Sequence, residues 1–146
     1  MKRILNAVMQ RLKEQVTDLR YIAEDWGQLD YYNDAPPVKF PCALVSVSNV
    51  KFESQTMERR YASMTILIRV ADAPLVCGTM AAPEAYRERA FAIFDVMDEI
   101  GRCLYAFGGE EFNEIEQQSI THYSREDAIR EYAMTFDTEY CVEYTE

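Results

Sequence analysis

Residues 42–70, CALVSVSNVKFESQTMERRYASMTILIRV, carry the pattern that decides the fold. Apolar and polar residues alternate along much of this stretch, which is the period of a β-strand with one covered face. A polar segment at 53–56 divides it, so the sequence predicts a hairpin of two strands, 42–52 and 57–70. Both faces are apolar at the start of the first strand, which predicts cover on both sides there. The second strand should turn these residues toward the core: Ala62, Met64, Ile66, Ile68 and Val70.

The length of this hairpin is informative. At about 3.3 Å per residue the second strand reaches ~45 Å, whereas a compact domain of this chain length has a radius of gyration of about 15 Å. The hairpin must therefore bend at a bulge or project beyond the body. We expect its charged end, which includes Arg59 and Arg60, to contact a neighbouring copy or a partner.

One helix is predicted before the hairpin in the sequence and one after it. Apolar residues at three- and four-residue spacing predict a helix at 3–19, and a short strand follows at 19–24. A second helix is expected from Pro83 to about Phe107, where Gly108 and the next glycine end it. Its expected core stripe is Ala90, Ile93, Phe94, Met97, Ile100 and Leu104.

Two more strands, at 112–123 and 129–144, complete the pattern. The resulting order is α-β-β-β-α-β-β. It predicts an α+β fold with one mainly antiparallel sheet, two helices packed on a face, and a long projecting hairpin. No linker, repeat or charge block divides the chain, so we expect a single domain over 1–146.

The composition narrows the function. The chain has 146 residues, with 15 Lys plus Arg against 25 Asp plus Glu and a net charge of -10. Such a surface repels phosphate backbones, so specific nucleic-acid binding is not expected. No apolar run approaches the ~18–20 residues that span a bilayer. We therefore expect no membrane contact and a cytoplasmic location.

Motifs for chemistry are missing from the sequence. The four cysteines lie far apart, which favours reduced and mostly buried thiols over a structural disulfide. His122 is the only histidine, and no glycine pattern forms a phosphate loop. We therefore predict no catalytic residue, no cofactor and no metal site. Two carboxylate clusters could be solvated or could hold a divalent cation: Asp25, Asp30 and Asp34, and Glu110, Glu111, Glu114 and Glu116.

The last strand has one apolar face and one acidic face. Tyr132, Met134, Phe136, Tyr140 and Val142 line the first. The acidic face is either a solvated surface or a lining with a negative potential. Its members are Glu131, Asp137, Glu139 and Glu143.

Aromatic residues stand out in the long loop between the first helix and the hairpin. Trp26, Tyr31 and Tyr32 lie in this Gly-, Asp- and Pro-containing segment. Loops are normally exposed, and exposed aromatic side chains often anchor protein interfaces. These three residues are therefore candidates for a subunit or partner contact, and local packing under the loop is the alternative.

The same region resembles a known family. The stretches at 25–30 (DWGQLD), 37–38 (PV) and 40–45 (FPCALV) resemble small prophage-encoded proteins grouped with phage minor tail and tail-completion proteins. The order of elements resembles the tail-terminator fold. This resemblance implies a non-enzymatic subunit in a ring, commonly a hexamer, that caps the tail tube and meets the head connector. It also implies a place in the virion once the prophage is active.

Two other functions remain possible from the sequence alone. One is a small-molecule or peptide-binding module with its pocket between helices and sheet. The other is an enzyme that uses carboxylates and a divalent metal. The long hairpin, the aromatic loop and the acidic strand favour a subunit that joins copies of itself head to tail.

Overall fold

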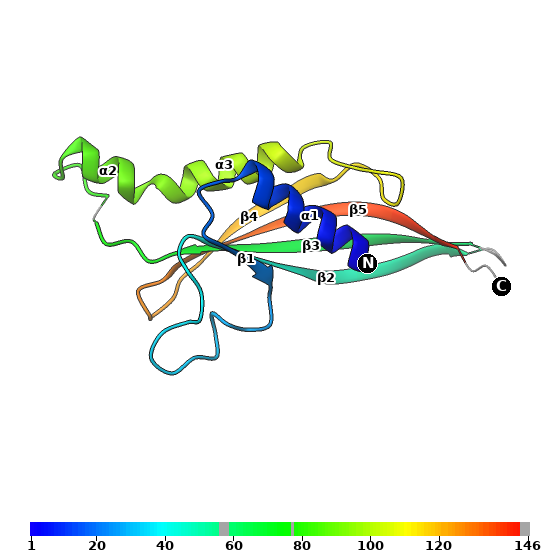
Figure 1. The fold of residues 1–146 in the computed structure, drawn as a ribbon, viewed down its shortest axis with the longest axis horizontal. Coiled ribbons are helices and arrows are strands. Elements are labelled where there is room, and N and C mark those ends of the chain that lie inside the picture. The colour runs from blue at the N-terminus through cyan, green and yellow to red at the C-terminus, as the bar shows by residue number, and fades with distance from the viewer. Residues whose placement is uncertain (56–58, 77, 144–146) are drawn as a thin grey trace.

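The computed structural model describes residues 1–55, 59–76 and 78–143. Five strands form one sheet in the order β1-β2-β3-β5-β4, with α1 and α3 on one side and the loop after β1 on the other (Figure 1). The strands are β1 (Tyr21–Glu24), β2 (Cys42–Gln55), β3 (Arg59–Asp72), β4 (Glu116–Tyr123) and β5 (Arg130–Glu143). The helices are α1 (Lys2–Gln15), α2 (Glu84–Ala90) and α3 (Ala92–Leu104).

The predicted α+β class and element order are confirmed, with two differences. The sheet is mixed, because β1 runs parallel to β2 while every other pair is antiparallel. The expected second helix is divided into α2 and α3 at Phe91, whose backbone leaves the helical range (φ -97°, ψ 5°). Apolar residues keep their helical spacing through this break, so the sequence pattern does not reveal it.

The core lies between the helices and the sheet. Ile4, Val8 and Leu12 of α1 and Ile100 of α3 are buried against it. The predicted inward set of β3 is confirmed, as all five of its residues are at most 2% exposed. The predicted α3 stripe is wrong at Phe94, whose side chain is 39% exposed and whose ring centre lies 5.6 Å from that of Tyr132.

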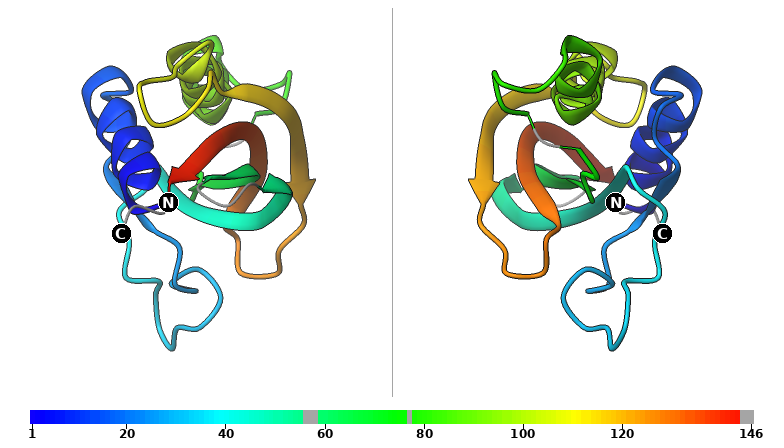
Figure 2. Two further views of the ribbon diagram at one scale, coloured as in Figure 1. Left: turned by 90° about the vertical axis from the view of Figure 1, so that its right-hand side faces the viewer. Right: turned by 90° about the vertical axis from the view of Figure 1, so that its left-hand side faces the viewer.

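The hairpin both bends and projects. The pairing register of β2 with β3 shifts between Val47 and Asn49 and again between Phe52 and Ser54. These irregularities accompany a marked curl of the sheet (Figure 2). Strand β2 continues to Gln55, so the first three residues of the predicted polar turn are strand, and the rest lies outside the described residues. The far ends of β2 and β3 extend past α1 (Figure 1).

The projecting end has three strands instead of the predicted two. Strand β5 pairs with β3 along its whole length, from Asp72↔Arg130 to Arg59↔Glu143. The third strand stiffens an arm that would otherwise be an isolated hairpin, which is only marginally stable.

The cysteines follow the expectation in part. Cys42 and Cys103 are buried free thiols, and desolvation raises the pKa of Cys42 to about 12 and that of Cys103 to about 11. Both are therefore uncharged and unreactive near neutral pH. Cys141 is a free thiol but exposed, and Cys77 lies outside the described residues.

Candidate functional site

The loop between β1 and β2 covers the second face of the sheet. Leu29 of this loop is fully buried in a small apolar cluster with Cys42, Leu44, Ala71 and Ile129. The start of β2 is thus covered on both faces, as its sequence predicts. The loop lies opposite α1 and α3, and it presents residues from the 25–32 segment at the surface (Figure 1).

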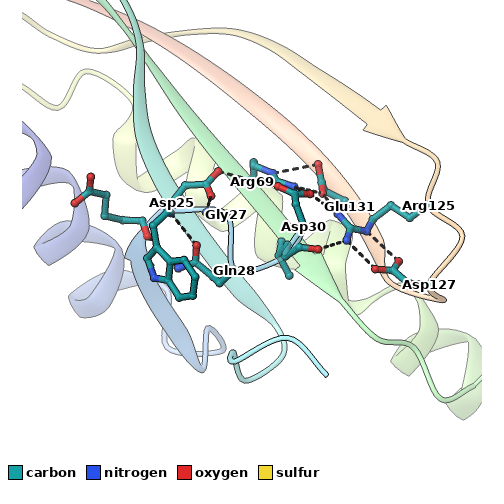
Figure 3. Close-up of polar contacts among 11 residues, drawn as sticks. Asp25, Gly27, Gln28, Asp30, Arg69, Arg125, Asp127 and Glu131 are labelled. Carbon is teal, nitrogen blue, oxygen red and sulfur yellow. Dashed lines mark hydrogen bonds and ion pairs between the residues drawn. The ribbon is translucent and has the colours of Figure 1, made fainter. Parts of the chain in front are cut away.

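Arg69 fastens the loop to the sheet. It lies on the face of β3 opposite the core, and its side chain is only 12% exposed. The guanidinium donates to both carboxylate oxygens of Asp30 at 2.9 and 3.0 Å and to Asp25 at 3.1 Å, which holds two points of the loop. It also donates to Glu131 of β5 at 2.7 and 3.3 Å (Figure 3).

Arg125 adds a second fastening from the turn between β4 and β5. It donates to Asp127 at 2.7 and 3.0 Å, to Glu131 at 2.7 Å and to the Leu29 carbonyl oxygen. Asp30 lies 3.4 Å from the same guanidinium. We call these six residues the arginine–carboxylate cluster: Asp25, Asp30, Arg69, Arg125, Asp127 and Glu131.

The two arginines of the cluster keep Asp30 and Asp127 charged. Hydrogen bonding from Arg69 is the main cause that lowers the pKa of Asp30. Hydrogen bonding from Arg125 lowers the pKa of Asp127 further below its ordinary value. Asp25 and Asp30, which the sequence offered as cation ligands, are thus bound to guanidinium groups. Across the described ranges, no group of three or more His, Cys, Asp or Glu side chains is arranged to hold a metal ion.

The tip of the loop is built from its own hydrogen bonds. Gln28 is fully buried: its side-chain oxygen accepts from the Trp26 N–H at 2.9 Å, and its amide donates to the Glu24 carbonyl at 3.0 Å. Asp25 accepts from the Gly27 N–H at 3.0 Å. With the backbone fixed in this way, Trp26 is held 62% exposed and Tyr31 82% exposed. Aromatic anchors on an ordered loop lose little entropy on binding.

We predict that Gly27→Ala disturbs this tip. Gly27 has φ +99°, a left-handed conformation unfavourable for alanine, and an added Cβ would lie 2.7 Å from the Tyr31 ring. Unfolding free energy should fall by about 1–2 kcal/mol, and Trp26 fluorescence should change because the loop shifts. Gly109→Ala is the control, since its Cβ would meet no atom closer than 3.8 Å. Equal unfolding midpoints for the two variants would contradict the prediction.

The other predicted interface residues have local partners. Tyr32 is half-buried and donates its hydroxyl to Asp127 at 2.6 Å, so it supports the loop. Arg59 lies at the end of the three-stranded arm and pairs with Glu143 at 3.2 Å, with both side chains more than half exposed. The Arg60 guanidinium lies 5.2 Å from the centre of the Phe52 ring.

The acidic face of β5 is present, but it loses one predicted member. Glu131 is 5% exposed and bound by two arginines, because the loop covers that end of the sheet. Asp137 and Glu139 instead line an open groove of about 770 Å³ farther along the arm. One lysine, Lys51, lines this groove together with five carboxylates: Glu53, Glu114, Glu116, Asp137 and Glu139.

Sequence reasoning missed Arg69 and Arg125. A strand residue that alternates away from the core is expected in solvent, and Arg69 follows that pattern. The signal in the sequence was a loop with two acidic residues, Asp25 and Asp30, that could lie over the sheet face carrying Arg69. An arginine beneath such a loop favours bidentate ion pairs with its carboxylates. Without the loop's path, that signal could not be recognised.

Comparisons with known proteins identify the fold. No family model matches this chain, and no curated protein matches it. Among solved structures, a chain of the "Virion of native gene transfer agent (GTA) particle" superposes with a TM-score of 0.56 at 16% sequence identity. The superposition covers 94% of both chains. No described helix is long and apolar enough to cross a membrane.

The superposition over 94% of both chains shows that this chain shares its overall fold with a chain of a gene transfer agent virion.

Proposed function

We propose that this protein is a non-enzymatic structural subunit of a phage-like tail. The observation that carries this proposal is the superposition over 94% of both chains, which extends to nearly every element. A particle component acts through its surfaces, and the surfaces described above are suited to assembly. They include exposed Trp26 and Tyr31 on an ordered loop and a stiff three-stranded arm.

Within a tail, the role we propose is that of a terminator or completion protein. The loop tip and the end of the arm are separate surfaces of the molecule (Figure 1). A contact between the loop tip of one copy and the arm of the next would therefore join copies head to tail. Such contacts generate rings when the rotation closes. The ring, which we propose to be a hexamer, would cap the tail tube and meet the head connector. The protein would be made in the bacterial cytoplasm and then enter the virion.

The acidic groove fits the inside of such a ring. DNA passing through a basic channel would be held by phosphate contacts and counterion release. A negative lining would repel the DNA and keep it mobile, and this repulsion reaches about 10 Å at 0.1 M salt. Asp137, Glu139 and Glu143 supply this charge from one side of β5.

The direct test is to look for the protein in particles. Particles purified from an induced host should contain it, and deleting its gene should stop production of complete particles until the wild-type chain is supplied. Isolated protein should form rings visible by negative-stain microscopy when the tube protein is added. Complete, infectious particles from the deletion strain would contradict the proposal.

Charge reversal at the arm should weaken assembly. We predict that Arg59→Glu with Arg60→Glu reduces ring formation at least about tenfold, because the end of the arm would exchange two positive charges for two negative ones in a chain of charge -10. Unfolding free energy should change by only ~0–1 kcal/mol, since exposed pairs contribute little to stability. Sedimentation velocity and urea unfolding measure the two effects. Lys13→Glu, on α1, is the control, and an equal loss of assembly there would argue against a specific arm contact.

A basic lining should retain DNA. We predict that Glu139→Lys with Glu143→Lys leaves rings able to form but makes them bind double-stranded DNA in a salt-sensitive way. Gel-shift assays at low and high salt, together with particle titres, measure this outcome. Glu84→Lys with Glu88→Lys, on α2, supplies the same charge elsewhere. Normal titres and no DNA binding by the β5 variant would place this face outside the channel.

A further inference from the structure

Strand β4 forms an open edge of the sheet. It pairs only with β5, and its outer backbone groups have no hydrogen-bond partner in the described part of the chain. All eight of its side chains are exposed. After Glu116, the remaining residues at 117–123 include no Asp, Glu, Lys or Arg. The row of unpaired N–H and C=O groups is therefore accessible.

Natural sheets usually protect such an edge. Lysine, proline, shortness and bulges are the common devices. Strand β1, at the other end of the sheet, is only four residues long. Strand β4 has one register shift, between Gln117 and Ser119, and is regular from Ser119 to Tyr123 without lysine or proline. An unprotected regular edge is a template for another extended chain.

A cavity opens beside one end of this edge. It has a volume of about 470 Å³ and lies between α3 and the start of β4. Leu104 and Tyr105 of the helix side and Ile115 and Phe136 of the sheet side form the apolar part of its lining, and Glu116, Gln117 and Gln118 of β4 form the polar part. Gly101 of α3 also lines it, and the end of the Gln117 side chain lies 2.8 Å from where a Cβ on Gly101 would be. The cavity can receive an apolar side chain from a chain lying along β4.

An aromatic row borders the other end of the same edge. The ring centres of His122 in β4 and Tyr132 are 4.9 Å apart. Those of Tyr132 and Phe94 are 5.6 Å apart, and those of Phe94 and Phe91 are 6.1 Å apart. Phe91 and Phe94 are 44% and 39% exposed. Pairing of Ile120 with Met134 and of His122 with Tyr132 places these β4 residues on the helix side of the sheet. Cavity, Ile120 and aromatic row thus follow one another along β4.

We propose that β4 binds an extended segment of a different protein, which adds to the sheet as a sixth strand. Backbone hydrogen bonds to β4 would supply affinity, and alternate side chains facing the cavity and the aromatic row would supply specificity. The segment would carry apolar side chains on that face and no acidic ones, because the chain has a net charge of -10. This inference does not depend on the proposed role in a tail.

A second copy of this chain fits the site less well. Antiparallel pairing of two β4 strands would offer the helix-side surface Gln117, Ile120 and His122. Only one of these three side chains is aliphatic, so most of the 470 Å³ cavity and the aromatic row would stay uncovered. These observations favour a foreign segment.

The test uses an acetylated and amidated peptide of sequence TVTFTVT as the probe. Titration up to about 1 mM, followed by amide NMR, should show saturable binding and slowed hydrogen exchange in β4. Ile120→Lys adds charge to the edge, and Gly101→Leu fills the cavity from α3. The nearest atom to a new Cβ at Gly101 is the end of the flexible Gln117 side chain, so space can be made. Each variant should weaken binding about tenfold or more.

Controls separate this mode from others. Gln10→Lys, on α1, should bind the peptide like the wild type, and a peptide N-methylated at alternate residues should not bind. Circular dichroism and the melting temperature establish that each variant is folded, and Ile120→Lys alone decides the question if Gly101→Leu is not. No binding, or equal binding by wild type and Ile120→Lys, overturns the inference. Concentration-dependent dimerisation that Ile120→Lys abolishes also overturns it, in favour of a second copy.

Discussion

Replacing Arg69 by methionine is expected to destabilise the protein by about 3–5 kcal/mol. Methionine keeps much of the side-chain length but removes the cation that three carboxylates share. Asp25 and Glu131 have side chains only 12% and 6% exposed, so water cannot replace the lost hydrogen bonds well. Breaking a buried pair costs much more than the intact pair contributes, because it leaves uncompensated charge. Urea unfolding followed by fluorescence and circular dichroism measures the change.

Two further variants test the cause of this effect. Arg59→Met removes an exposed ion pair and should cost only ~0–1 kcal/mol. Adding Asp25→Asn and Asp30→Asn to Arg69→Met should recover part of the lost stability, since it removes two of the stranded charges. An unfolding free energy for Arg69→Met within about 0.5 kcal/mol of wild type would show that the arginine–carboxylate cluster does not hold the loop.

Replacing Trp26 by alanine is expected to reduce assembly by about thirtyfold or more, which corresponds to about 2 kcal/mol or more for an interface anchor. The side chain is 62% exposed, and its backbone N–H, which bonds to Gln28, remains in the variant. Unfolding free energy should therefore stay within about 0.5 kcal/mol of wild type. Ring formation with the tube protein and incorporation into particles are the measurements.

Met80→Ala provides the matched control for Trp26→Ala. Met80 is 82% exposed and lies outside the aromatic loop, so a general loss of apolar surface would affect both variants alike. Full assembly by Trp26→Ala, or equal losses in the two variants, would remove the aromatic loop from the interface. A large loss of stability in Trp26→Ala would instead assign the residue a packing role.

The sheet could be predicted because burial on one face leaves a period of two in the sequence. The inward residues of β3 from Ala62 to Val70 follow that period without exception, and the start of β2 is apolar on both faces because both are covered. Helix ends were less accurate. Gln15 ends α1 four residues before the predicted limit, and Phe91 interrupts the second helix, because apolar spacing reports a buried stripe and not the hydrogen bonds beneath it.

The candidate site could be predicted only in outline. Trp26 and Tyr31 are exposed as expected, because a loop segment has little room to bury large side chains. Glu131 shows the limit of the method: alternation assigns it to the correct face of β5 but cannot say which segment covers that face. The partners of Arg69 come from parts of the chain 39 to 62 residues away, and no local pattern encodes such distances.

The arginine–carboxylate cluster also sets an order of events during synthesis. Arg125 bonds to the Leu29 carbonyl across 96 residues of sequence. At about 5–20 residues per second, the ribosome makes that interval in roughly 5–20 s. Arg69 is made 39 residues after Asp30, whereas Arg125 is the later of the two arginines to be made. The surface around Trp26 that we propose as an interface therefore gains its last fastening only when translation has passed Glu131.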